Sequence, residues 1–85
     1  MQVEIRYFAL LREAVGRASE TLDVPEDVAN VGALRAWLVA KGEPWAGAFA
    51  NLKRVRAARN DVMVGDEEPV EAGDVVAFFP PVTGG

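Results

Sequence analysis

The first stretch of the chain alternates between apolar and polar side chains. Over residues 2–8, Val3, Ile5 and Tyr7 fall on one side, and a mainly polar set that ends with Phe8 falls on the other. An alternation of period two, carried by β-branched and aromatic side chains, predicts a strand. Phe8 is out of phase with the apolar side, so the pattern predicts an apolar side chain on the solvent face of a sheet.

The pattern then changes to helical spacing. Apolar residues at i, i+3 and i+4 predict a short helix over residues 9–15, which Gly16 can end in the left-handed conformation. Similar criteria predict a second strand, the main helix and a further helical turn. The second strand covers residues 19–24 and is stopped by Pro25. The main helix covers residues 31–41, with Asn30 as N-cap and Gly42 at the end. The helical turn covers residues 44–49, where Trp45 and Phe49 would share a face.

The second half of the chain is predicted to hold a third strand, a short hairpin and the last strand. They cover residues 53–60, residues 61–64 with a turn at Gly65-Asp66, and residues 75–79, which Pro80 and Pro81 end. The main helix falls in the connection between the second and third strands, which permits a mixed four- or five-stranded sheet with the terminal strands side by side.

This α+β arrangement is a roll of the ubiquitin-like β-grasp kind. We expect a single domain over residues 1–79, followed by a flexible tail over residues 80–85.

The composition excludes several kinds of active site. The chain has 85 residues, no cysteine and no histidine, and Ser19 is its only serine. It therefore has no thiolate nucleophile, no Cys-ligated zinc and no Ser-His-Asp triad. A self-contained enzyme is not expected.

Charge and hydropathy restrict the expected binding partners and cellular location. The formal net charge is -4, which argues against a dedicated nucleic-acid binder. No apolar run approaches the roughly 20 residues of a membrane span. The first residues lack the basic region and apolar stretch of a signal peptide. We expect a cytoplasmic protein that binds neither nucleic acid nor a membrane.

The C-terminal tail carries the strongest functional signal in the sequence. The two prolines end the sheet and make the chain leave it stiff and extended. Gly84 and Gly85 follow without side chains, so they can enter a channel too narrow for a Cβ atom. The carboxylate of Gly85 is then an unhindered group on a flexible arm, which suits a carrier whose end is activated in the active site of another protein.

The tail and several other segments resemble a known family. Residues 77–85, Ala-Phe-Phe-Pro-Pro-Val-Thr-Gly-Gly, look like the C-terminus of the small, sulfur-carrier subunits of molybdopterin synthase, the MoaD type. Residues 6–16, 31–38 and 73–79 are similar to the N-terminal strand and helix, the main helix and the final strand of that family. The resemblance covers essentially the whole chain.

The resemblance implies a β-grasp fold and a role in sulfur transfer. A partner enzyme related to ubiquitin activators would adenylate Gly85, using ATP and magnesium, and sulfur would replace the adenylate to give a thiocarboxylate. Gly84 would provide access. The tail would enter the large synthase subunit and donate sulfur to precursor Z (cyclic pyranopterin monophosphate). Two small and two large subunits would form a heterotetramer, and this chain would itself bind no cofactor and no metal.

The resemblance also indicates a partner-binding surface. Phe8, Met63 and Phe79 match positions that contribute to an apolar partner surface in this family, with core packing as the alternative for each. Pro80 and Pro81 would position the tail. Val82 and Thr83 would make contacts in the partner's channel.

A basic run in the second half is open to two interpretations. Lys53, Arg54, Arg56 and Arg59 form either a solvated strand face or a surface that steers the chain toward an acidic partner.

Three other functions remain open for the tail. The chain could carry sulfur for thiamine synthesis or tRNA thiolation, it could be a ubiquitin-like modifier joined to target lysines, or it could be an interaction module with an inert tail.

Overall fold

A computed structural model of the chain describes residues 1–50 and 54–81. Within these residues the chain forms five strands and three helices. In chain order they are β1 (Gln2–Tyr7), α1 (Ala9–Val15), β2 (Ser19–Asp23), α2 (Val31–Ala40), α3 (Trp45–Ala50), β3 (Arg56–Arg59), β4 (Val62–Val64) and β5 (Val75–Phe79).

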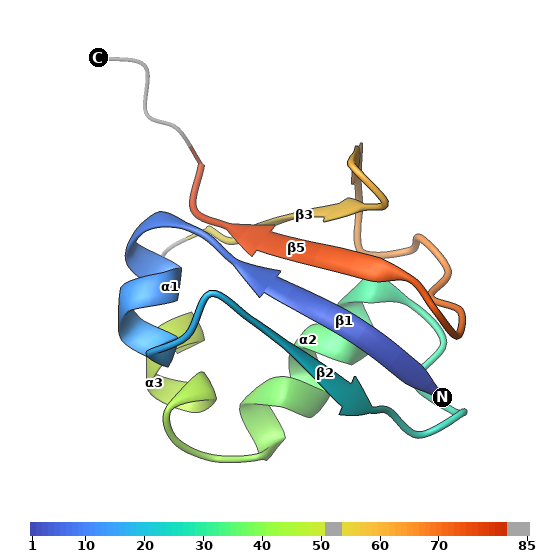
Figure 1. The fold of residues 1–85 in the computed structure, drawn as a ribbon, viewed down its shortest axis with the longest axis horizontal. Coiled ribbons are helices and arrows are strands. Elements are labelled where there is room, and N and C mark those ends of the chain that lie inside the picture. Colours follow the sequence, from blue (N-terminus) through green and yellow to red (C-terminus); the bar gives the residue numbers. More distant parts are fainter. Residues whose placement is uncertain (51–53, 82–85) are drawn as a thin grey trace.

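The strands of the described residues form one sheet in the order β2-β1-β5-β3-β4. Figure 1 labels β2, β1, β5 and β3 in this order. The first and last strands, β1 and β5, are parallel neighbours at its centre, and the other pairs are antiparallel. The expected mixed sheet with adjacent terminal strands is therefore confirmed, as is the β-grasp roll. β4 lies at one edge of the sheet, a position that matters for the site described below.

One face of the sheet packs against the helices. The alternating residues Val3, Ile5 and Tyr7 of β1 are buried, as are Val76 and Phe78 of β5. They form one core cluster with apolar residues of the three helices, including Leu11, Leu34, Leu38 and Phe49. The alternate side chains of the same strands point to the other face of the sheet.

The helix boundaries follow the predicted caps. Gly16 ends α1 with φ of 86°, in the left-handed region that glycine adopts readily. Asn30 is the N-cap of α2, since its side chain accepts a hydrogen bond from the Ala33 amide at 2.8 Å. Both predicted caps are confirmed.

The prediction for the β3–β4 hairpin was partly wrong. β3 begins at Arg56 rather than near residue 53, and Lys53 lies outside the described residues. The hairpin turn is Asn60-Asp61 and not Gly65-Asp66. Both turn residues have positive φ, 49° and 72°, which matches the type I′ turn that suits the twist of paired strands. The segment at Asp66 instead covers the start of α2, where its carbonyl accepts from the Gly32 amide at 3.0 Å.

A polar cluster joins β1, β2 and α3 at the edge of the core. The Tyr7 hydroxyl donates to Glu20 at 2.7 Å, and the Trp45 indole donates to Glu20 at 2.9 Å and to the Tyr7 hydroxyl at 3.2 Å. Burial, followed by the Glu20 carboxylate, raises the pKa of Tyr7. Burial alone would raise the pKa of Glu20, but the hydrogen bonds from Tyr7 and Trp45, together with the nearby Arg17 guanidinium, outweigh it and lower that pKa. Trp45 therefore packs at the rim of the core.

Replacing Tyr7 with Phe is expected to lower the free energy of unfolding by about 1–2 kcal/mol, because a buried hydroxyl that donates to a carboxylate is lost. Glu20 keeps its bond to Trp45, which limits the loss. Chemical denaturation of the two proteins measures the difference. Equal midpoints and slopes would show that the hydroxyl contributes nothing.

Candidate partner-binding site

An apolar groove lies on the face of the sheet that the helices leave uncovered. It has a volume of about 440 Å³. Its lining comes from the junction of β1 with α1, from β3, from the turn and β4 that follow β3, and from β5 and the residue after it. The lining residues are Phe8, Ala9, Ala58, Asp61, Met63, Ala77, Phe79 and Pro80.

Two alanines on neighbouring strands form the floor of the groove. Ala77 of β5 is paired with Ala58 of β3, and Ala58 is paired with Met63 of β4. Residues paired across a sheet point to the same face, so these three side chains lie in a row. The small side chains leave a hollow between the larger Met63 on one side and the aromatic rings of Phe8 and Phe79.

The structure brings together the three residues predicted to face a partner. Phe8 is 47% exposed and Met63 is 56% exposed, so core packing does not describe either of them. Phe79 is half-buried beside them. Exposed apolar side chains gathered around one hollow are typical of a docking surface.

The predicted tail residues divide between described and undescribed parts of the chain. Pro80 lines the groove directly after β5, and Pro81 is half-buried. The Phe8 amide donates to the Phe78 carbonyl at 3.2 Å, which holds the end of β1 against the end of β5. The tail therefore starts at the groove. Val82, Thr83, Gly84 and Gly85 lie outside the described residues.

Sequence reasoning missed the floor of the groove and, on its hairpin side, Asp61. Ala58, Ala77 and Asp61 carry no individual signal, because alanine is common on both faces of sheets. Ala77 is nevertheless out of phase with Val76 and Phe78, as Phe79 is. That phase could have placed Ala77 on the same face as Phe79. Ala58 could be placed only once the pairing of β3 with β5 was known.

The basic run does not act as one surface. Arg54 and Arg56 are exposed, and Arg56 is paired with Phe79 beside the groove. Arg59 instead points into a polar network, so neither predicted role describes it. Its guanidinium contacts Asp74 at 2.8 Å and Glu68 at 3.1 Å, and lies 3.7 Å from Glu71.

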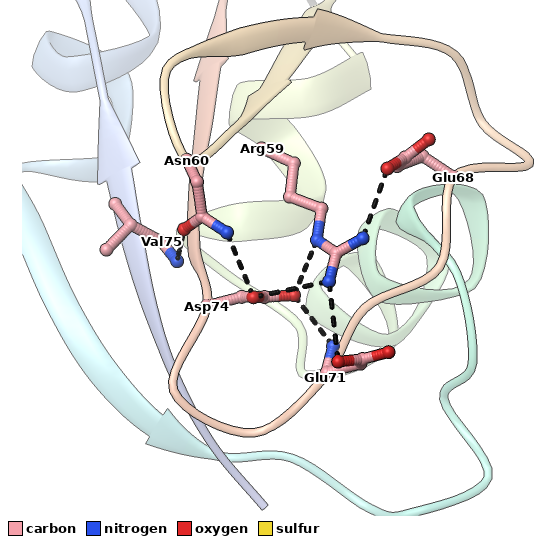
Figure 2. A network of polar contacts seen from close by, with 6 residues as sticks. All are labelled: Arg59, Asn60, Glu68, Glu71, Asp74 and Val75. Carbon is pink, nitrogen blue, oxygen red and sulfur yellow. Dashed lines mark hydrogen bonds and ion pairs between the residues drawn. The ribbon is translucent and has the colours of Figure 1, made fainter.

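Asp74 is the centre of this network (Figure 2). Its carboxylate accepts from Arg59, from the Asn60 side chain at 3.1 Å and from the Glu71 amide at 2.7 Å. Burial alone would raise the pKa of Asp74, but these hydrogen bonds outweigh it and lower the pKa. The hydrogen bonds to Asp74 and Glu68 raise the pKa of Arg59.

Acid is expected to weaken the fold through Asp74. The Asp74 carboxyl has a lower pKa in the folded state than in the unfolded chain, where its pKa is near 3.8. The resulting stabilisation of the folded state is present above that pH. It is lost as the pH falls through the lower pKa that Asp74 has in the folded state. Denaturation curves should show a free energy of unfolding that falls at acid pH, with a smaller fall in Asp74→Asn. Equal pH dependence in the two proteins would contradict this.

Two kinds of feature are absent from the described residues. Residues 1–50 and 54–81 hold no group of three or more His, Cys, Asp or Glu side chains that could bind a metal ion. In the same part of the chain, no helix is long and apolar enough to cross a membrane.

The fold and the groove define a class of protein. A mixed sheet with parallel terminal strands, packed on a main helix, is the ubiquitin-like β-grasp fold. Here it carries an apolar groove where the C-terminal tail begins. A family model described as the ThiS family matches residues 5–85, and the chain belongs to this family.

Individual relatives agree with this assignment. The chain is 41% identical over 83 residues to the molybdopterin synthase sulfur carrier subunit of Escherichia coli K12, covering 98% of this chain and 99% of the relative. It is 28% identical to small archaeal modifier protein 1 of Haloferax volcanii, with a TM-score of 0.78 and coverage of 95% and 98%. It is 26% identical to a chain in the complex of subunits 1 and 2 of the molybdopterin-converting factor from Helicobacter pylori 26695, with a TM-score of 0.66 and full coverage of both chains.

Proposed function

We propose that this chain is the small, sulfur-carrying subunit of molybdopterin synthase. The observation that carries the proposal is the apolar groove at the start of a tail that ends in Gly84-Gly85. The identity to the Escherichia coli sulfur carrier subunit extends over nearly the whole of both chains. The related Helicobacter pylori chain was solved as a complex of two subunits, which supports a large-subunit partner for this one.

The proposed chemistry takes place at the carboxylate of Gly85. A carboxylate is a poor acyl donor because its leaving group is oxide. A partner enzyme would transfer AMP from ATP to this carboxylate, with release of pyrophosphate. A sulfur nucleophile would then displace AMP, leaving a thiocarboxylate. ATP and magnesium would bind to the activating enzyme, which would supply the nucleotide-binding site.

The groove would hold the large subunit while the tail reaches its active site. Phe8, Met63 and Phe79 would contact the large subunit, and Pro80 and Pro81 would keep the start of the tail extended. Val82 and Thr83 would lie in the partner's channel, with the sulfur of Gly85 next to precursor Z. The chain would not catalyse the reaction alone. Two such chains and two large subunits would form the working heterotetramer, in the cytoplasm where ATP is supplied.

The test is to load the chain with sulfur and follow its mass. The full chain is incubated with the activating enzyme, ATP, magnesium and a sulfur donor, and its intact mass is measured. Exchange of one oxygen for sulfur should add roughly 16 Da, and this gain should disappear when precursor Z and the large subunit are added. An unchanged mass with an activating enzyme proven active on another carrier would overturn the proposal.

A second candidate function is covalent modification of other proteins. The structural likeness to small archaeal modifier protein 1 favours it, and activation of a terminal glycine serves both chemistries. In this case the amine of a target lysine would attack the acyl adenylate, forming an amide bond with Gly85 and releasing AMP. Denaturing gels would show higher-mass conjugates that require Gly85. A complex with the large subunit that dissociates fully in denaturant would favour the sulfur-carrier function.

A further inference from the structure

One side of the groove is built on the least supported strand of the sheet. Met63 lies on β4, which spans Val62–Val64 and occupies the edge of the sheet. Asp61, in the turn that precedes β4, also lines the groove. An edge strand of this length is held by its pairing with β3 alone. Without a further restraint, Met63 would not have a fixed position relative to Phe79.

Asn60 supplies a restraint at the turn. Its backbone amide donates to the Val75 carbonyl at 2.8 Å, and its side-chain oxygen accepts from the Val75 amide at 2.9 Å. Its side-chain nitrogen donates to Asp74 at 3.1 Å. The turn of the β3–β4 hairpin is thus attached to the start of β5 by three hydrogen bonds, as Figure 2 shows for the two made by the side chain.

Asp74 is itself held in place. Its side chain is 9% exposed, and besides Asn60 it is bound by the Arg59 guanidinium and by the Glu71 amide. Asp74 lies outside the groove lining, and its burial keeps it from contact with a docked protein. Any effect of Asp74 on docking is therefore indirect, and its bond to Asn60 connects it to the hairpin.

We propose that Asn60 and Asp74 are positioning residues for partner binding. They fix the β3–β4 hairpin so that Met63 and Asp61 already line the groove in the free chain, before a partner binds. A groove formed in advance avoids the entropy of ordering an edge hairpin during docking. This inference rests on the proposed function, because it takes the large synthase subunit as the partner.

Two variants disturb this restraint in different ways. Asp74→Asn keeps the shape of the side chain but places a donor NH₂ group against the donors of Arg59, Asn60 or Glu71. Asn60→Gly removes both side-chain bonds while glycine accepts the positive φ of the turn. Asp27→Asn is the matched control, since Asp27 is exposed, does not line the groove and loses the same charge.

The experiment measures two quantities on the full chain at a temperature where each variant is folded. Both positioning variants should bind the large subunit roughly tenfold more weakly than the wild type, as expected for the loss of one or two hydrogen bonds that preorganise the surface. Hydrogen exchange should become faster at β4 and stay unchanged at β1 and at residues 76–79 of β5, whereas the Val75 amide, which loses its bond in Asn60→Gly, is left out of the comparison. Asp27→Asn should match the wild type in both measurements.

The outcomes separate this inference from the proposed function. Faster exchange at β4 with unchanged affinity would show that the two residues serve stability alone and would overturn the inference. Unchanged exchange at β4 in Asn60→Gly would also overturn it. If Asp74→Asn does not fold, Asn60→Gly still decides the question. If the wild type does not bind the large subunit, the proposed function fails first, while the exchange data still test whether Asn60 and Asp74 fix the hairpin.

Discussion

Deleting Gly84 and Gly85 is expected to abolish sulfur loading while leaving the folded domain able to dock. In the proposed chemistry, the deletion would remove the acceptor carboxylate from the position that the activating enzyme reaches. The new terminus, Thr83, carries a branched side chain that a channel fitted to glycine would exclude. Intact mass after incubation with activating enzyme, ATP and a sulfur donor should show no gain, against roughly 16 Da for the full chain.

The same variant provides its own control for docking. Its groove residues are unchanged, so it should still bind the large subunit and compete with the full-length carrier in synthase assays. Competition without sulfur transfer would separate the roles of groove and tail. A gain in mass by the shortened chain would mean that the sulfur acceptor is another group. Loss of both loading and competition would mean that the tail supplies most of the binding energy.

The central part of the fold could be predicted because its sequence signals are local. The alternation of Val3, Ile5 and Tyr7 defines β1, and the diproline after Phe79 defines the end of β5. The caps at Gly16 and Asn30 act within a few residues of their helices. Phe8 and Phe79 could be placed on the exposed face because each is out of phase with the buried side of its own strand.

The hairpin could not be predicted well because its determinants are distant in sequence. β3 contains two arginines and two alanines, without the β-branched residues that usually mark a strand. Its turn, Asn60-Asp61, lies close to Gly65-Asp66, which carries a stronger turn signal. The observed turn is fixed by Asp74 and Val75, more than a dozen positions away. The floor of the groove could not be predicted for the same reason. Ala58 and Ala77 are distant in sequence and become neighbours only through the pairing of β3 with β5.

Introducing a carboxylate at Met63 is expected to weaken binding to the large subunit at least about 100-fold. Met63→Glu removes apolar contact worth about 1.5–3 kcal/mol when fully buried, and it places an unpaired charge in the interface. Because Met63 is 56% exposed in the free chain, the free energy of unfolding should change by less than about 1 kcal/mol. The loss should therefore appear in binding and not in folding.

The neighbouring residue offers a matched control. Val62 is on the same strand and is 64% exposed, but successive side chains of a strand point to opposite faces, and Val62 does not line the groove. Val62→Glu introduces the same charge one position away and should change the affinity by no more than about threefold. Titration calorimetry with the purified large subunit compares the two variants. Equal losses would place the interface on the strand edge, and no loss in either would place it elsewhere, so only a loss confined to Met63→Glu assigns the docked surface to the groove.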